Sequence, residues 1–344
     1  MTNSWRALAR MARDRLVTSD PEDLNLVLSL WYLRLACLAR LRLFNQTAAE
    51  CTTLFAVLNA VEPPESKSWL FERLLPFELE VMHARLKYWS GDHMGYLDAL
   101  YALMKKCKFK AREAKNDVVL VSMWKERGAR VCLILASQLI EMKDFTAAAK
   151  LLEPLCPIVP TADASPQSTP SNINANPEAA GSSAITGSGS PALRSAIARI
   201  YLQVGNLPMA TQHFSIVASD PEVDENTKDM NEALLASAEG EWETATAALR
   251  RIVTRDPENY VAINNLSVTL LSQGDLSESI QVLEAALASS PSSVVVAEPY
   301  LFNLSTLYEL RSAEAMEKKK NLLIEVAKWS GDGLRTTCLK MPTN

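Results

Sequence analysis

Glycine and histidine are both scarce in this chain of 344 residues, with 11 and 3 copies respectively. So few glycines argue against the glycine-rich loops that cradle phosphate groups, and neither GxGxxG nor GxxxxGK[ST] occurs in the sequence. The histidines His83, His93 and His213 form no HExxH or HxH arrangement, so they give little basis for a metal centre. We therefore expect a protein that is not an enzyme and that holds neither a metal nor a cofactor.

The chain also lacks cysteine pairs and long apolar runs. Its 6 cysteines include no CxxC spacing, which favours buried free thiols in a reducing compartment. The longest uninterrupted apolar run, Val131 to Ala136, is far shorter than the ~20 residues of a membrane-spanning helix. The N-terminus shows no secretory signal peptide. These features predict a cytoplasmic protein without a transmembrane segment.

Charge is unevenly distributed along the chain. Residues 1–156 contain 22 basic and 18 acidic residues, whereas residues 157–344 contain 13 basic and 22 acidic residues. The net charge of the whole chain is −5. This balance argues against a general nucleic-acid binder, which needs a basic surface. A basic half followed by an acidic half instead suggests that the two ends contact different partners.

A repeat of 34 residues runs through the second half of the chain. It relates Gly240 to Gly274 and Pro257 to Pro291, and Gly205 precedes Gly240 by nearly the same interval. The glycine suits the left-handed end of a first helix, a small residue follows five positions later where a second helix crosses closely, and the proline begins the next unit. This pattern is typical of the tetratricopeptide repeat (TPR), which has two antiparallel helices per unit. We therefore predict an all-α, TPR-like α-solenoid of antiparallel helix pairs.

Weaker copies of the pattern predict further helix pairs on both sides of these repeats. The expected pairs span 26–58, 76–104 and 131–155, and a last pair spans 298–310 and 314–329. The resulting domain prediction is a degenerate TPR region over 1–156, TPR repeats with a C-terminal capping pair over 192–329, and a tail over 330–344.

Residues 157–191 interrupt the array. They contain six prolines and three glycines but no lysine, arginine or aromatic residue. A segment of this composition cannot bury a hydrophobic core, so we predict a disordered insertion between two stacked repeats.

One segment is densely basic, with Phe109 inside it. Such a composition is typical either of a helix face that is simply solvated or of a patch that binds an anionic partner. The anionic partner would be a membrane surface or an acidic protein. Its basic residues are Lys105, Lys106, Lys108, Lys110, Arg112 and Lys115.

The last predicted helix pair resembles a known family. The run from Leu301 to Leu310, the Met316–Lys320 segment and the ending Cys338-Leu339-Lys340 are similar to the C-terminal region of the subunit 12 family of the transport protein particle (TRAPP) complex. The likeness extends through most of residues 24–340. It implies a non-catalytic subunit of the TRAPP III form of a vesicle-tethering complex whose core promotes nucleotide exchange on a Rab GTPase. It also implies the large subunits 8, 11 and 13 as partners, a place at ER–Golgi and Golgi membranes, and a role in autophagy.

We therefore expect a scaffold that docks rigidly onto other subunits. The alternative is a free-standing TPR adaptor that captures a short peptide in its concave groove, although the lysines that clamp a terminal carboxylate in some TPR grooves are missing. The asparagines among the candidates either satisfy a partner's backbone or bond neighbouring helices. The candidate protein-binding residues are Asn264, Asn265, Phe302, Asn303, Tyr308, Lys318, Lys319 and Lys320.

Overall fold

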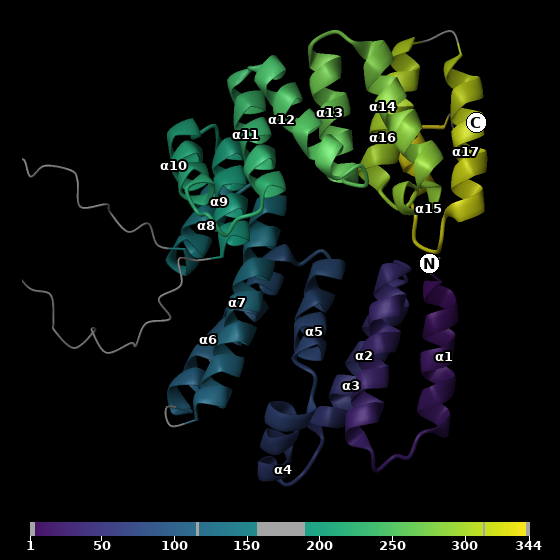
Figure 1. Ribbon diagram of the computed structural model, residues 1–344. Helices are drawn as coiled ribbons and strands as arrows, with labels where there is room; N and C mark the ends of the chain where they lie inside the picture. The colour runs from purple at the N-terminus through teal and green to yellow at the C-terminus, as the bar shows by residue number, and fades with distance from the viewer. Residues whose placement is uncertain (1–3, 115–116, 157–189, 312–313, 342–344) are drawn as a thin grey trace, which may run out of the picture. The chain divides into compact units, whose positions relative to one another are not determined.

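The computed structural model describes residues 4–114, 117–156, 190–311 and 314–341. Every regular element in these ranges is a helix, which confirms the all-α prediction (Figure 1). Before the predicted insertion, the α-helices are α1 (Trp5–Thr18), α2 (Leu24–Arg40), α3 (Phe44–Asn59), α4 (Pro64–Trp69), α5 (Phe77–Trp89), α6 (His93–Glu113), α7 (Val118–Glu141) and α8 (Phe145–Leu152). After it come α9 (Pro191–Val204), α10 (Leu207–Ala218), α11 (Glu225–Glu239), α12 (Trp242–Arg255), α13 (Tyr260–Ser272), α14 (Leu276–Ser289), α15 (Pro291–Val294), α16 (Glu298–Arg311) and α17 (Ala315–Trp329). Short π or 3-10 turns cover Leu70–Leu74, Glu153–Leu155 and Thr336–Leu339.

The chain divides into two compact units. Residues 136–240 form the smaller one, and residues 1–135 together with 241–344 form the larger one. In the smaller unit, α9 and α10 pack through Ala198 and Ala210, with Phe214 beside them. In the larger unit, separate buried clusters hold α1 against α2, the segments from α2 to α5, and the helices from α13 to α17.

The small residue predicted in the second helix is fully buried in four of the pairs. Ala148, Ala210, Ala245 and Ser279 each have no exposed surface. A larger side chain at these positions would push the two helices of a pair apart, because close-packed interiors tolerate little extra volume.

The predicted turns adopt the left-handed conformation that suits glycine. The φ angles of Gly205, Gly240 and Gly274 are 81°, 83° and 90°, and that of Gly91 is 88°. Two degenerate pairs reach the same conformation with other residues, since Arg42 and Lys143 have φ angles of 60° and 67°. A side chain with a Cβ atom is strained there, yet the turn still forms, which explains why the glycine signal weakens in the first half of the chain.

The residue after the left-handed position often caps the next helix. The side chains of Asp92, Asp144, Asn206 and Asp275 each accept a hydrogen bond from the backbone N–H three residues later. These caps satisfy donors that the first helical turn leaves without a partner, and so they fix where each second helix begins.

Helix α7 differs from the expectation at its start. It begins at Val118 rather than Val131, because the Asp117 carboxylate accepts hydrogen bonds from the N–H groups of Val119 and Leu120 and caps the helix there. Helix α6 likewise continues past Met104 to Glu113, through lysine and alanine residues that favour helix. The predicted insertion lies outside the described residues except for Ser190 and Pro191, and Pro191 is the first residue of α9.

The segment after α17 contacts the first helices of the larger unit. Asp332 accepts a hydrogen bond of 2.9 Å from the backbone N–H of Arg6, in the first turn of α1. Glu298 forms ion pairs with Arg42 at 3.4 Å and Arg335 at 2.8 Å. Burial raises the pKa of Glu298, but the bonds from Arg335 outweigh it, and the net pKa is lowered. These contacts join sequence-distant ends of one unit.

Candidate protein-docking surface

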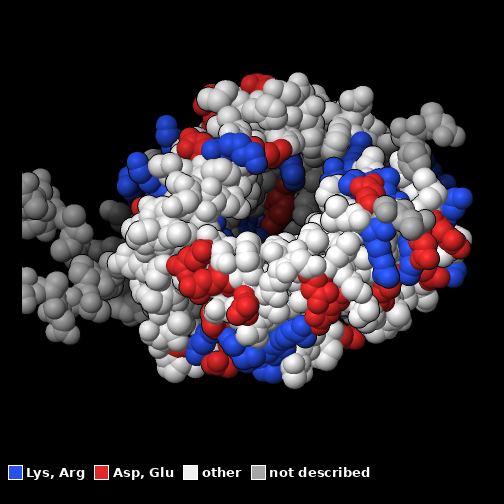
Figure 2. Space-filling model, turned by 90° about the horizontal axis from the view of Figure 1, so that it is seen from above, with Lys and Arg blue, Asp and Glu red and all other residues white. Residues whose placement is uncertain are grey.

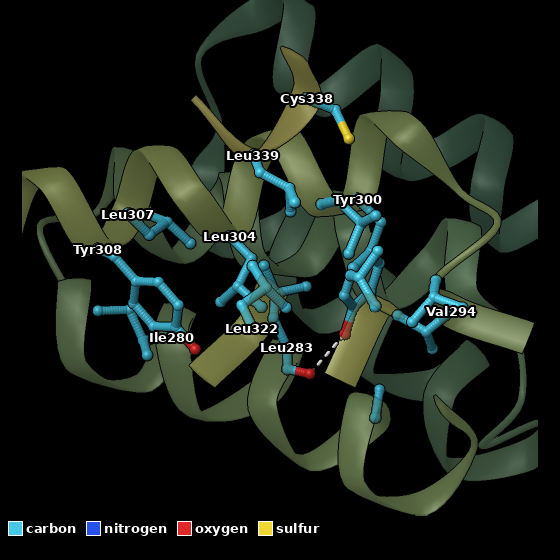
Figure 3. Close-up of a cluster of buried hydrophobic side chains, with 14 of the residues drawn as sticks. Ile280, Leu283, Val294, Tyr300, Leu304, Leu307, Tyr308, Leu322, Cys338 and Leu339 are labelled. Carbon is cyan, nitrogen blue, oxygen red and sulfur yellow. Dashed lines mark hydrogen bonds between the residues drawn. The ribbon is translucent and has the colours of Figure 1, made fainter. Parts of the chain in front are cut away.

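Helices α14, α16 and α17 enclose a buried core near the C-terminus. The Tyr300 hydroxyl donates a hydrogen bond of 2.6 Å to the carbonyl oxygen of Leu283, and burial raises the pKa of this tyrosine (Figure 3). Leu304 and Leu322 belong to the same cluster, and Figure 3 shows Leu339 of the C-terminal segment directed into it. Because this core is closely packed, it holds the helices of the last pair, and the surface residues on them, in fixed positions.

The predicted asparagines lie on neighbouring helices. The Asn303 side-chain amide of α16 donates a hydrogen bond of 3.0 Å to the side-chain oxygen of Asn264 on α13, and Asn265 is half-buried beside Asn264. This geometry matches the interpretation in which the asparagines bond neighbouring helices. Phe302 is about half exposed, and the Lys340 ammonium lies 5.3 Å from the centre of its ring.

Most of the other predicted contact residues make internal pairs. The Tyr308 hydroxyl and the Lys318 ammonium each donate to the Glu284 carboxylate at 2.9 Å. Lys319 is buried and donates to the Glu309 carboxylate and to the carbonyl oxygen of Lys340. Lys320 is exposed, whereas Lys318 is half-buried. The role of these residues in binding stays a prediction, and in the described structure most of them brace the last helix pair.

A row of exposed residues on α17 includes only Lys320 from the sequence-based candidates. Met316, Lys320, Leu323 and Ala327 recur at intervals of three or four residues, and Ile324 lies next to them with 55% exposure. Residues at these intervals share one helix face. We call Met316, Lys320, Leu323, Ile324 and Ala327 the α17 stripe. Their spacing is visible in the sequence, but the spacing alone does not say which face of α17 is buried.

A groove runs beside the α17 stripe between α14 and α17. Its lining includes Leu287, Ala288 and Pro291 from the α14 side and Leu322 and Ile324 from α17. The charged residues in the lining are Glu284, Lys318 and Glu325. Surfaces that receive a partner protein commonly combine apolar and charged side chains in this way.

The basic segment on α6 is divided by the fold. Lys106 pairs with Glu80 at 2.6 Å, and Lys110 pairs with Glu72 at 2.9 Å and with Glu113. Lys105, Lys108 and Arg112 are exposed, whereas Lys115 lies outside the described residues. On the face that Figure 2 shows, several groups of acidic side chains lie beside basic ones.

The described residues give no basis for catalysis by a thiol or a metal. All six cysteines are unpaired and buried, as predicted, and burial raises the pKa of Cys51 and Cys107 to about 11. Such thiols stay protonated at neutral pH and are poor nucleophiles. No cluster of three potential metal ligands occurs in the described ranges, and none of the helices described there is long and apolar enough to cross a membrane.

The fold and its turns define a TPR-like α-solenoid, and residues 236–297 match the family model for the tetratricopeptide repeat. Two relatives with assigned names point to a more specific kind of protein than the repeat family does. The chain is 27% identical to trafficking protein particle complex subunit 12 of Mus musculus over 357 residues, which cover 96% of this chain and 40% of the relative. It is also 27% identical to the Homo sapiens protein of the same name over 354 residues, which cover 95% of this chain and 43% of the relative. The chain thus spans less than half the length of these relatives.

Two solved structures are also similar to the chain. A crystal structure of a tetratricopeptide repeat protein from Parabacteroides merdae has 11% sequence identity and a TM-score of 0.46, covering 98% of this chain and 96% of that one. The crystal structure of the P58(IPK) TPR domain has 11% identity and a TM-score of 0.24, covering 98% and 95% of the two chains.

Proposed function

We propose that this chain is a non-catalytic scaffold subunit of a TRAPP-type complex, which tethers vesicles and promotes nucleotide exchange on a Rab GTPase. The observation that carries the proposal is the extent of the similarity to TRAPP subunit 12, which covers 95–96% of this chain. Similarity over that length includes the repeats and the C-terminal helix pair. The proposal extends to ER–Golgi transport, autophagy and a place at the cytoplasmic side of those membranes.

The docking surface in this proposal is the α17 stripe with the groove beside it. Partner subunits would bury Met316, Leu323 and Ile324, which otherwise hold apolar surface in water. A few such side chains at the centre of an interface usually supply most of the binding free energy. The last helix pair is already well packed, so docking would cost little conformational entropy in that pair. We propose one of the large subunits 8, 11 and 13 as the partner.

Charged substitutions on the stripe test this surface. Met316→Glu with Ile324→Glu would place two carboxylates in the proposed interface while leaving the buried side of α17 unchanged. The matched control is Met11→Glu with Val57→Glu, since these residues lie on α1 and α3 and are 67% and 64% exposed. Tagged versions are purified from cells that express the chain naturally, and co-purified subunits are quantified by mass spectrometry.

We expect the stripe variant to lose at least one large TRAPP subunit about tenfold or more, because buried unpaired charge opposes association. The control variant keeps the wild-type set of partners. Circular dichroism melting checks that both variants fold. A wild-type chain that purifies as a monomer and binds short peptides would contradict the scaffold proposal and favour the peptide adaptor.

A further inference from the structure

The exposed basic residues of α6 lie on one face of the helix. Lys105, Lys108 and Arg112 follow one another at intervals of three and four residues, and Tyr101 precedes them on the same face. A separate face of α6 carries its buried residues, which include Leu100, Met104 and Cys107. Within the part of the chain that the structure describes, these three cations form no ion pair, unlike Lys106 and Lys110. Their charge therefore faces solvent.

Large apolar side chains are exposed at the same end of this helical hairpin. Phe109 on α6 is 59% exposed, and Val118 and Val119 in the first turn of α7 are 81% and 77% exposed. Helices α6 and α7 run antiparallel, since the Cys132 sulfur lies 3.5 Å from that of Met104, and a Cβ on Gly128 would lie 3.5 Å from the Cβ of Cys107. The end of α6 and the start of α7 consequently lie together, as Figure 1 shows.

We propose that this end of the α6–α7 hairpin is a peripheral contact site for an anionic lipid bilayer. Lys105, Lys108 and Arg112 would contact the lipid headgroups along one face of α6, and Phe109, Val118 and Val119 would enter the boundary between headgroups and acyl chains. Basic residues attract the negative surface of a membrane, and exposed apolar residues beside them add affinity by leaving water. We name these six residues the hairpin-end site.

The shape of the site favours a bilayer over an acidic protein. Side chains at the end of a helical hairpin project outward, and a fluid bilayer accepts them without complementary shape. An acidic protein would also pair with the three cations, but it would need an apolar patch in matching register to cover Phe109, Val118 and Val119. A bilayer presents an anionic layer above an apolar one at every point of its surface. The inference does not depend on the proposed TRAPP assembly, because it concerns the isolated chain.

Flotation of the purified chain with lipid vesicles tests the site. The vesicles are phosphatidylcholine alone or phosphatidylcholine mixed with phosphatidylserine, each at low and high salt. We expect binding only to the mixed vesicles, and weaker binding as salt screens the charges. The variant Lys105→Gln, Lys108→Gln and Arg112→Gln is expected to bind about 100-fold more weakly, at about fivefold per basic residue.

Two further variants separate charge from apolar contact. The variant Phe109→Ser with Val119→Ser keeps every charge and should weaken binding about tenfold or more, since it removes the inserted surface. The control Arg73→Gln, Lys87→Gln and Lys150→Gln makes the same change in net charge at other exposed positions and should bind as the wild type does. All these side chains are at the surface, so the variants should fold, which melting curves can check.

Several outcomes would overturn the inference. They are equal binding to both kinds of vesicle, no binding to either, or equal loss of binding in the hairpin-end and control variants. Retention of the chain on immobilised polyglutamate without binding to vesicles would instead assign the exposed cations to an acidic protein.

Discussion

The C-terminal segment after α17 should contribute strongly to stability through Leu339. This side chain has no exposed surface and packs with Tyr300 and Leu304 in the core of the last helix pair (Figure 3). Replacing a buried leucine by alanine costs about 2–5 kcal/mol, depending on how far the cavity closes. Because Leu339 lies near the chain end, where the backbone can shift to fill part of the space, we expect Leu339→Ala to cost about 3 kcal/mol.

The cost should appear locally as well as globally. Loss of about 3 kcal/mol corresponds to a rise of about 100-fold in the rate at which protected amides of α16 exchange their hydrogens. We also expect Leu339→Ala to free the next residue, Lys340. The carbonyl oxygen of Lys340 accepts a hydrogen bond from Lys319, and its ammonium group pairs with Glu309. Hydrogen exchange measured by mass spectrometry on wild type and variant follows both effects.

The control is Leu310→Ala on the same helix pair. Leu310 is 56% exposed, so its truncation should change stability by less than about 0.5 kcal/mol. If Leu339→Ala exchanged at the wild-type rate, the segment would not be part of the core, and the account of the last helix pair would be refuted.

Three further predictions concern other positions. Lys143→Gly should stabilise the chain by about 1 kcal/mol in urea unfolding, since Lys143 has a φ of 67° that glycine adopts without strain; a loss of stability would contradict this. Tyr300→Phe should lower stability by about 1 kcal/mol, as its bond to the Leu283 carbonyl is removed, and an unchanged melting temperature would argue against that bond. His213 is fully buried, and burial and then Arg194 lower its pKa from 6.5. Below pH 6.5 the unfolded chain binds a proton at this histidine that the folded chain resists, so the free energy of unfolding falls as pH drops, by at most about 1.4 kcal/mol per pH unit. In melting experiments from about pH 7.5 to 5.5, the melting temperature should fall less in His213→Phe than in the wild type. An equal fall in both proteins would refute this role.

Much of the fold could be predicted because its signals are local. Gly205, Gly240 and Gly274 mark turns whose backbone conformation depends on one residue, and Ala210 and Ala245 mark helix crossings at a fixed distance from those turns. Such positions recur with the repeat and need no knowledge of distant contacts. The start of α7 differs from the prediction because its cap, Asp117, belongs to no repeat.

The surface was harder to predict, because pairing between distant residues decides which charges remain free. Lys106 and Lys110 resemble Lys105 and Lys108 in sequence, but acidic residues from α5 and the preceding π turn neutralise them. Lys319 likewise resembles Lys320, yet it is buried. The packing of the C-terminal segment depends on Cys338 and Leu339 folding back onto the core of α13 to α17, and no periodicity marks these two residues. The predicted domain boundaries stay predictions.

The most direct test of the central proposal is affinity purification of the tagged chain from cells that express it naturally, followed by sizing and mass spectrometry. The proposal predicts a large, stable assembly that contains the TRAPP large subunits and the core that acts on a Rab GTPase. A chain that elutes as a monomer, or in small complexes with chaperones or unrelated peptides, would contradict it.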